Sequence, residues 1–88
     1  MIKNKKLERL RKEIDLVDRN ISGLICKRLS IASQIRKVKK ANQIKIEDKN
    51  RERIVINKVK KAVKSTKQKR AISNIYKEII KQTKLLER

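Results

Sequence analysis

The chain has 88 residues, 42% of them charged, and 28 lysines and arginines against 9 acidic residues give a formal net charge of +19. A chain this short forms one small domain, residues 1–88, and buries too little surface to be comfortably stable alone, so we expect a partner chain. Histidine is absent and Cys26 is the single cysteine, which excludes a disulfide framework and a histidine- or cysteine-rich metal site, and we predict no metal.

The composition and the apolar periodicity predict an all-α fold of three helices. Proline, phenylalanine and tryptophan are absent and glycine occurs once, which is typical of a helical protein with an aliphatic core. We predict one very long helix over residues 5–40, a shorter one over 49–63, and a third from about residue 66 to the C-terminus. No apolar run approaches membrane-spanning length and no signal sequence is visible, so we expect a cytoplasmic protein without a membrane partner.

The long predicted helix carries an apolar stripe at seven-residue spacing with a single break. The stripe consists of Leu7, Leu10, Ile14, Val17, Ile21, Leu24, Ile31, Ile35 and Val38. Arg28 occupies the position where the pattern calls for another apolar residue. Because an unpaired buried charge is very costly, we expect Arg28 to face a carboxylate of the protein or of a ligand, or else water. Arg28 therefore marks the expected site.

The face that carries Arg28 also carries a second cation. Arg28, Ala32, Ile35 and Lys39 follow one another at intervals of four, three and four residues, which places them on one side of the helix. The two cations lie ~16 Å apart along the helix, and their long side chains could hold opposite ends of a small polyanion. Arg11 lies ~25 Å from Arg28 along the helix, so only a partner subunit could bring it to the same pocket.

The later segments carry recognisable helix starts. Ile44 and Ile46 alternate with polar residues, which suggests an extended connection whose apolar side chains pack inward. Asp48 is a good N-cap for the second helix, and Ser65 with Gln68 has the form of a capping box for the third. The expected core stripes are Ile54, Val55, Val59, Ala62 and Val63 in the second helix, and Ile72, Ile75, Ile79, Ile80, Thr83 and Leu86 in the third.

The high positive charge raises the possibility of a nucleic-acid partner, but its distribution weighs against one. Lysine and arginine divide evenly, with 14 of the 28 in residues 1–46 and 14 in residues 47–88. Tyr76 is the one aromatic residue available to stack on a base. The scarcer acidic residues Glu52 and Glu87 could pair with Arg28, Lys39 or Arg51 as ordinary salt bridges.

The polar residues form an ordered pattern along the whole chain. Its pieces are LRKEID at residues 10–15, Asp18, KR at 27–28, VK at 38–39, DKNRER at 48–53, and Thr83 followed by Glu87. This ordered set resembles the active-site pattern of the all-helical chorismate mutases. The resemblance implies an intertwined homodimer of three-helix chains, with chorismate as substrate and two sites that each borrow an arginine from the partner. The implied reaction is the [3,3] rearrangement of chorismate to prephenate, which needs no cofactor.

The resemblance also implies roles for the cations. Arg28 and Arg11 of the partner subunit would hold the two substrate carboxylates, with Arg51 in support and Thr83 adding a hydroxyl. Catalysis requires the flexible enolpyruvyl arm to be held over the ring in a chair-like geometry, and fixed cations provide that restraint. Glu52 would accept a hydrogen bond from the ring hydroxyl.

The remaining implied roles concern the ether oxygen and the ring. Lys39 and Glu87 would donate to the ether oxygen, on which negative charge builds as the carbon–oxygen bond breaks. Many family members have glutamine where this chain has Glu87, and a glutamate donates only when protonated, so we expect activity to favour mildly acidic pH. Asp48 would shape one corner of the site, and Ile35 and Ile80 would line the ring.

Two other functions remain open from the sequence. An isochorismate-pyruvate lyase of the same fold would use a similar cationic pocket on a closely related substrate. A basic helical nucleic-acid-binding or adaptor protein would explain the charge and the long helix but not the break at Arg28. Affinity for nucleic acid would fall steeply with added salt, whereas a pocket enclosing a small dicarboxylate would be far less sensitive.

Overall fold

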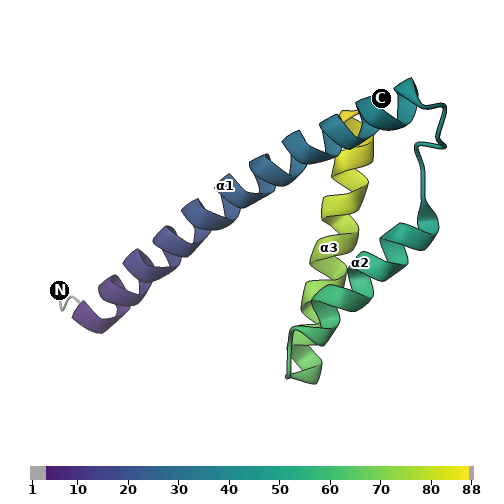
Figure 1. Ribbon diagram of the computed structural model, residues 1–88. Coiled ribbons are helices and arrows are strands. Elements are labelled where there is room, and N and C mark those ends of the chain that lie inside the picture. The colour runs from purple at the N-terminus through teal and green to yellow at the C-terminus, as the bar shows by residue number, and fades with distance from the viewer. Residues whose placement is uncertain (1–3, 88) are drawn as a thin grey trace. The chain divides into compact units, whose positions relative to one another are not determined.

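The computed structural model describes residues 4–87 and has three helices, which confirms the all-α class and the very long first helix. They are α1, Lys5–Ala41, α2, Lys49–Lys61, and α3, Thr66–Leu86 (Figure 1). Within residues 4–87 no strand is present, and no helix is long and apolar enough to cross a membrane. The chain divides into two units, and the boundary lies inside α1 between Ala32 and Ser33.

The first unit is the N-terminal part of α1, whose start is fixed by a side-chain cap. The N–H of Leu7 donates to Oδ1 of Asn4 at 3.0 Å, and the N–H of Glu8 donates to the carbonyl of Asn4 at 3.1 Å. Glu8 also places a negative charge in the first turn, where it interacts favourably with the helix dipole. These contacts explain why the helix begins at the residue that the sequence predicts.

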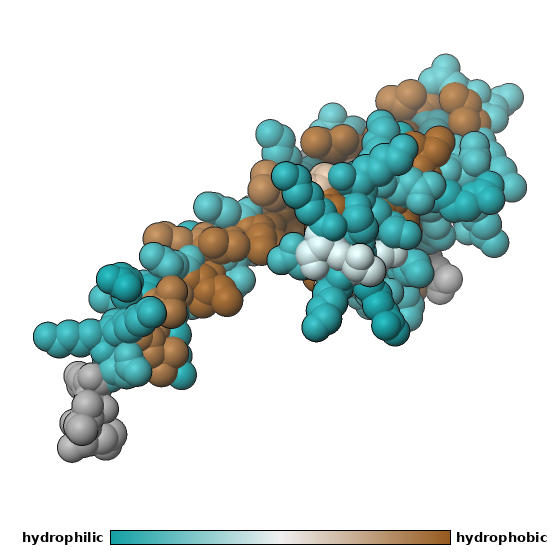
Figure 2. Space-filling view, turned by 90° about the horizontal axis from the view of Figure 1, so that it is seen from below, coloured by the Kyte–Doolittle hydropathy of each residue, from teal (hydrophilic) through white to brown (hydrophobic). Residues whose placement is uncertain are grey.

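The apolar stripe of this first unit is exposed in the single chain. Its exposed members are Leu7, Leu10, Ile14, Val17, Ile21, Leu24 and Ile31. None of the residues of α1 is buried, and Figure 2 shows apolar side chains running along this part of the helix. A stripe of this length and regularity is the pattern that a partner helix covers.

The end of α1 is a Schellman motif with an unusual residue at its centre. The N–H of Ile44 donates to the carbonyl of Lys39 at 2.8 Å, and the N–H of Gln43 donates to the carbonyl of Lys40 at 3.3 Å. Gln43 adopts the left-handed conformation, with φ of 57°, which glycine usually provides at this position. The chain therefore turns sharply directly after the helical turn that carries Lys39.

The connection from α1 to α2 does not pack as the sequence suggested. The side chains of Ile44 and Ile46 are 53% and 44% exposed, so the expectation that they pack inward is wrong for this chain. Polar contacts hold the connection instead. The ammonium of Lys39 donates to the carbonyl of Ile46 at 3.1 Å, and that of Lys84 donates to Glu47 at 3.3 Å.

Helix α2 begins as predicted and ends earlier. Oδ1 of Asp48 accepts the N–H of Arg51 at 2.9 Å, which confirms Asp48 as the N-cap. The helix stops two residues before the predicted end, since Ala62 forms the C-cap and the N–H of Val63 donates to the carbonyl of Lys60 at 3.1 Å. Such a three-residue hydrogen bond tightens the last turn and satisfies a carbonyl that the α-helix leaves unpaired.

Helices α2 and α3 pack against each other as a helical hairpin (Figure 1). Oγ of Ser65 accepts the N–H of Gln68 at 3.3 Å, which confirms the predicted N-cap of α3. The ammonium of Lys69 donates to the carbonyl of Lys60 at 2.6 Å and so ties α3 to the end of α2. Ser73 is the one buried residue among those that the structure describes.

The apolar residues between these two helices are half-buried rather than fully enclosed. Half-buried positions include Val55, Ile56, Val59, Val63, Ile72, Tyr76, Ile79 and Ile80. The predicted stripe missed Ile56 and included Ile54, Ala62, Ile75 and Leu86, which are exposed. Two helices can cover only one face of each other, so the apolar residues at the edges of the stripe stay in contact with water.

Candidate functional site

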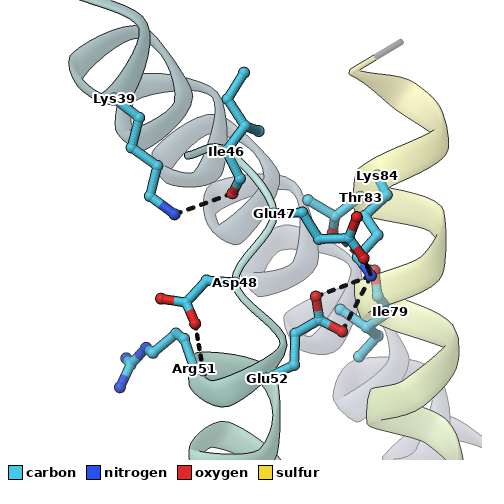
Figure 3. Close-up of polar contacts among 9 residues, drawn as sticks. All are labelled: Lys39, Ile46, Glu47, Asp48, Arg51, Glu52, Ile79, Thr83 and Lys84. Atoms are coloured by element: carbon cyan, nitrogen blue, oxygen red, sulfur yellow. Dashed lines mark hydrogen bonds and ion pairs between the residues drawn. The ribbon is translucent and has the colours of Figure 1, made fainter. Parts of the chain in front are cut away.

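Polar side chains of the second unit gather where the connection meets the start of α2 and the last turns of α3. Figure 3 shows Lys39, Asp48, Arg51, Glu52 and Thr83 in this region. All five were expected from the sequence to contact a ligand. The contacts described below show how each is held.

Lys39 is half-buried near the end of α1 and reaches across the turn that follows it. Its ammonium donates to the carbonyl of Ile46 at 3.1 Å, while its own carbonyl accepts the N–H of Ile44. An ammonium group has three donors, so two remain for water or a ligand. Lys39 thus presents a fixed positive charge beside the connection (Figure 3).

Asp48 is the N-cap that precedes α2, and Arg51 stands in the first turn of that helix. The carboxylate of Asp48 is engaged with the backbone N–H of Arg51, and it also favours the positive end of the helix dipole. The guanidinium of Arg51 is exposed and available to an anion. Asp48 therefore fixes the start of α2, and Arg51 presents a positive charge from its first turn.

Glu52 is bound by a lysine from α3. The ammonium of Lys84 lies 2.8 Å from Oε2 and 3.1 Å from Oε1 of Glu52, and it also contacts Oε1 of Glu47 at 3.3 Å (Figure 3). The hydrogen bond to Glu52 raises the pKa of Lys84. The hydrogen bond and charge of Lys84 lower the pKa of Glu47, which keeps that carboxyl ionised.

Thr83 and Glu87 occupy the last turns of α3. The hydroxyl of Thr83 donates to the carbonyl of Ile79 at 2.7 Å, so its oxygen remains able to accept a hydrogen bond. Glu87 is the C-cap residue, and its carboxylate lies 3.7 Å from Nε of Arg36 on α1. Only 17% of the Glu87 side chain is exposed. Nε of Arg36 is buried and makes no hydrogen bond with the described residues. The carboxylate of Glu87 therefore offsets part of the cost of burying the positive charge of Arg36.

An open groove of about 710 Å³ lies between α2 and α3. Its lining residues are Lys49, Glu52, Arg53, Ile56, Asn57, Lys77, Ile80, Lys81 and Lys84. The volume falls within the roughly 300–1,000 Å³ common for small-molecule sites. Glu52 and Ile80 are the two predicted site residues that line it, whereas Ile35 is 51% exposed on α1.

Arg11 and Arg28 belong to the first unit. Arg28 is half-buried on α1, and Arg11 is exposed on the same helix. The participation of these two arginines in a site with Lys39 stays a prediction.

Sequence reasoning missed three charged residues of this region, namely Arg36, Glu47 and Lys84. Lys84 stands four residues after Ile80 and therefore on the same face of α3, so its place in a half-apolar stripe was a signal that could have revealed it. The pairing of Arg36 with Glu87 joins residues 51 positions apart and has no local signature. Within residues 4–87, no group of three histidine, cysteine or acidic side chains is placed to hold a metal ion.

Comparison with known families identifies the pattern. The sequence matches the family model of chorismate mutase type II over residues 10–88, a range that includes every predicted site residue from Arg11 to Glu87. No curated protein matches the sequence. The matched range covers nearly the whole chain, and the three helices, the first very long, agree with the all-helical fold that the resemblance implied. The chain therefore belongs to the chorismate mutase type II family.

Proposed function

We propose that this protein catalyses the [3,3] rearrangement of chorismate to prephenate, the step that leads towards phenylalanine and tyrosine. The observation that carries the proposal is the family match over residues 10–88. The charges around the start of α2 support it, because a dicarboxylate with a ring hydroxyl needs cations and one acceptor in a confined space. Lys39 and Arg51 supply such cations, and Glu52 supplies such an acceptor.

The working form that we propose is a homodimer. The stripe on the first unit of α1 leaves large apolar side chains in water, including Leu24 at 65% exposure and Ile14 at 57%. Burying them against the same stripe of a second copy would remove that cost, at ~25 cal/mol for each Å² of apolar surface covered. A second copy would also bring its Arg11 to the neighbouring site, which the same chain cannot do.

In the proposed mechanism, the protein restrains the substrate and stabilises developing charge. Arg28 and the partner subunit's Arg11 hold the two carboxylates, so the enolpyruvyl arm stays folded over the ring. The conformational entropy of the arm is therefore lost when the substrate binds, and this loss does not add to the activation free energy. Arg51 and Thr83 support the carboxylates. As the ether bond breaks, donors at its oxygen bind the transition state more tightly than the substrate, and Lys39 is the principal donor.

The remaining roles concern the far side of the substrate. Glu87, in its protonated form, is the second donor to the ether oxygen. Glu52 accepts from the ring hydroxyl, and Asp48 holds the start of α2 in place. The apolar side chains of Ile35 and Ile80 pack against the ring. No step of this rearrangement requires a nucleophile or a cofactor.

The decisive experiment follows the loss of chorismate absorbance on adding purified protein, with the product identified. The wild-type chain is compared with Arg28→Ala and with Arg19→Ala, a matched change at an exposed arginine of α1 outside the apolar stripe. Prephenate formation that is lost in Arg28→Ala and retained in Arg19→Ala would support both the function and the site. Release of pyruvate from isochorismate would replace the proposal by a lyase, and no turnover at any pH would favour a nucleic-acid-binding or adaptor role.

A further inference from the structure

One lysine outside the predicted site joins three segments of the second unit. The ammonium of Lys84, on α3, lies 2.8 Å and 3.1 Å from the two carboxylate oxygens of Glu52 on α2, and 3.3 Å from Glu47 in the connection. Figure 3 shows it between the two carboxylates. Glu52 is one of the residues proposed to contact the substrate, so Lys84 lies directly beside the proposed site.

The contact with Glu52 constrains orientation as well as charge. Lys84 approaches both carboxylate oxygens of Glu52, whereas it contacts one oxygen of Glu47. A contact to both oxygens fixes the plane of the carboxylate, and a charge-assisted hydrogen bond is about twice as strong as a neutral one. The Glu52 side chain is 27% exposed and that of Glu47 is 51% exposed, so the contact with Glu52 is also the less hydrated of the two.

We propose that Lys84 is a positioning residue that holds the Glu52 carboxylate ready to accept the hydroxyl of the substrate ring. The inference rests on the proposed function. A glutamate side chain without such a partner rotates freely and samples many orientations, most of which point its oxygens away from the hydroxyl. Because Lys84 holds the Glu52 carboxylate in place before the substrate reacts, the entropy cost of ordering that side chain does not add to the activation free energy.

Lys84 has a second effect on the charge of this corner. Glu52 is an anion beside a substrate that carries two carboxylates, and like charges at close range repel. The ammonium of Lys84 compensates Glu52, and it adds a positive charge at the groove that Glu52 lines. Loss of Lys84 therefore weakens substrate binding, which raises KM. It also slows the reaction of the bound substrate, which lowers kcat.

The test compares the steady-state kinetics of the full-length wild type with those of Lys84→Met, Lys84→Arg and Lys67→Met. Methionine keeps much of the length of lysine without its charge, and Lys67 is an exposed lysine of α3 outside the groove. We expect Lys84→Met to lower kcat/KM roughly tenfold through both a lower kcat and a higher KM. Lys84→Arg should recover most of that loss, and Lys67→Met should match the wild type.

A double-mutant cycle with Glu52→Gln separates positioning from general destabilisation. If Lys84 acts through Glu52, then adding Lys84→Met to Glu52→Gln should cause little further loss of kcat, because the carboxylate that Lys84 holds is already gone. Equal losses of kcat from Lys84→Met with and without Glu52 would overturn the inference. Far-ultraviolet circular dichroism of each variant checks that the helices are intact, and the Lys84→Arg variant keeps the test valid if Lys84→Met folds poorly.

The outcomes also separate this inference from the proposed function. Wild-type protein that converts no chorismate would overturn the proposed function and the inference together. Wild-type protein that forms prephenate, with Lys84→Met equally active, would overturn only the role of Lys84.

Discussion

At the level of single residues, the ion pair of Glu87 with Arg36 and the proposed role of Glu87 as a hydrogen-bond donor require different forms of its carboxyl group. The ionised form of Glu87 pairs with the guanidinium of Arg36 at 3.7 Å, whereas only the protonated form can donate to an ether oxygen. If chorismate is the substrate, as proposed, the pH dependence of activity reports which form of Glu87 works in the complex.

We predict that wild-type activity rises as the pH is lowered from about 8 to about 5, because the proposed mechanism uses the protonated form of Glu87 as a donor. A Glu87→Gln variant carries a permanent donor and should lack this rise. The measurement is kcat across that pH range for both proteins in one buffer system of constant ionic strength. Superimposable pH profiles would mean that Glu87 does not donate a hydrogen bond from a protonated carboxyl group in the reaction.

The contacts of Lys84 predict how stability depends on pH. Lys84 lowers the pKa of Glu47 below the ordinary 4.5, so this contribution is present above pH 4.5 and is lost as the pH falls through the lowered pKa. Glu52 raises the pKa of Lys84 above 10.5, so that contribution is present below pH 10.5 and is lost as the pH rises through the raised value.

The difference in free energy of unfolding between wild type and Lys84→Met should therefore be constant across neutral pH. It should shrink below pH 4.5 and above pH 10.5. Urea unfolding followed by circular dichroism, at one protein concentration, measures it. A difference that stays the same at both extremes would show that these ion pairs do not contribute to stability.

At the level of the helix, Asp48 combines a structural and an electrostatic role. We predict that Asp48→Ala lowers the free energy of unfolding by about 1 kcal/mol, because the N–H of Arg51 loses its acceptor. Asp48→Asn keeps the capping oxygen and removes the charge, so it should retain most of the stability. Urea unfolding separates the two variants, and equal destabilisation would assign the effect to charge rather than to capping.

The sequence was informative about helix starts and less so about helix ends. Asp48 and Ser65 are short polar residues whose side chains cap locally, and both were predicted correctly. The end of α1 depends on Gln43 in a left-handed conformation that glutamine rarely adopts, so no residue type announced it. The end of α2 was placed late because the apolar pattern continues through Val63 after the helix has stopped.

The grouping of Asp48, Arg51 and Glu52 at the start of α2 was predictable from their spacing, whereas the contacts that join distant segments were not. Asp48, Arg51 and Glu52 lie within one helical turn, so their proximity follows from local geometry. The contact of Lys84 with Glu52 spans 32 residues and depends on how α2 packs against α3. Periodicity predicts which face of a helix packs, but it does not specify which polar residues meet across that face.

At the level of the whole molecule, the proposed dimer makes a prediction that no single variant can test. If each site uses Arg28 from one chain and Arg11 from the other, then Arg11→Ala and Arg28→Ala homodimers each lack a needed arginine at both sites. A mixed dimer of the two variants contains one site with both arginines and one with neither. Random exchange at equal concentrations should therefore restore about one quarter of wild-type activity.

The measurement unfolds the two inactive variants together in urea, refolds them by dilution and follows prephenate formation. Each variant refolded alone is the control for incomplete inactivation. If the mixture stays as inactive as its components although exchange has occurred, the two arginines act within the same chain. An Arg11→Ala variant that is active when refolded alone would show that Arg11 has no role.

The groove between α2 and α3 also has a consequence for how fast a substrate arrives. Five of its lining residues are cations, namely Lys49, Arg53, Lys77, Lys81 and Lys84, against the single anion Glu52. A concave surface of one sign concentrates the electric field, and it steers a dianion towards the site before any contact forms. In the proposed reaction, the cations of the groove would therefore act on the diffusion of chorismate as well as on its binding. Where capture of the substrate limits turnover, kcat/KM should fall as salt is added while kcat holds steady.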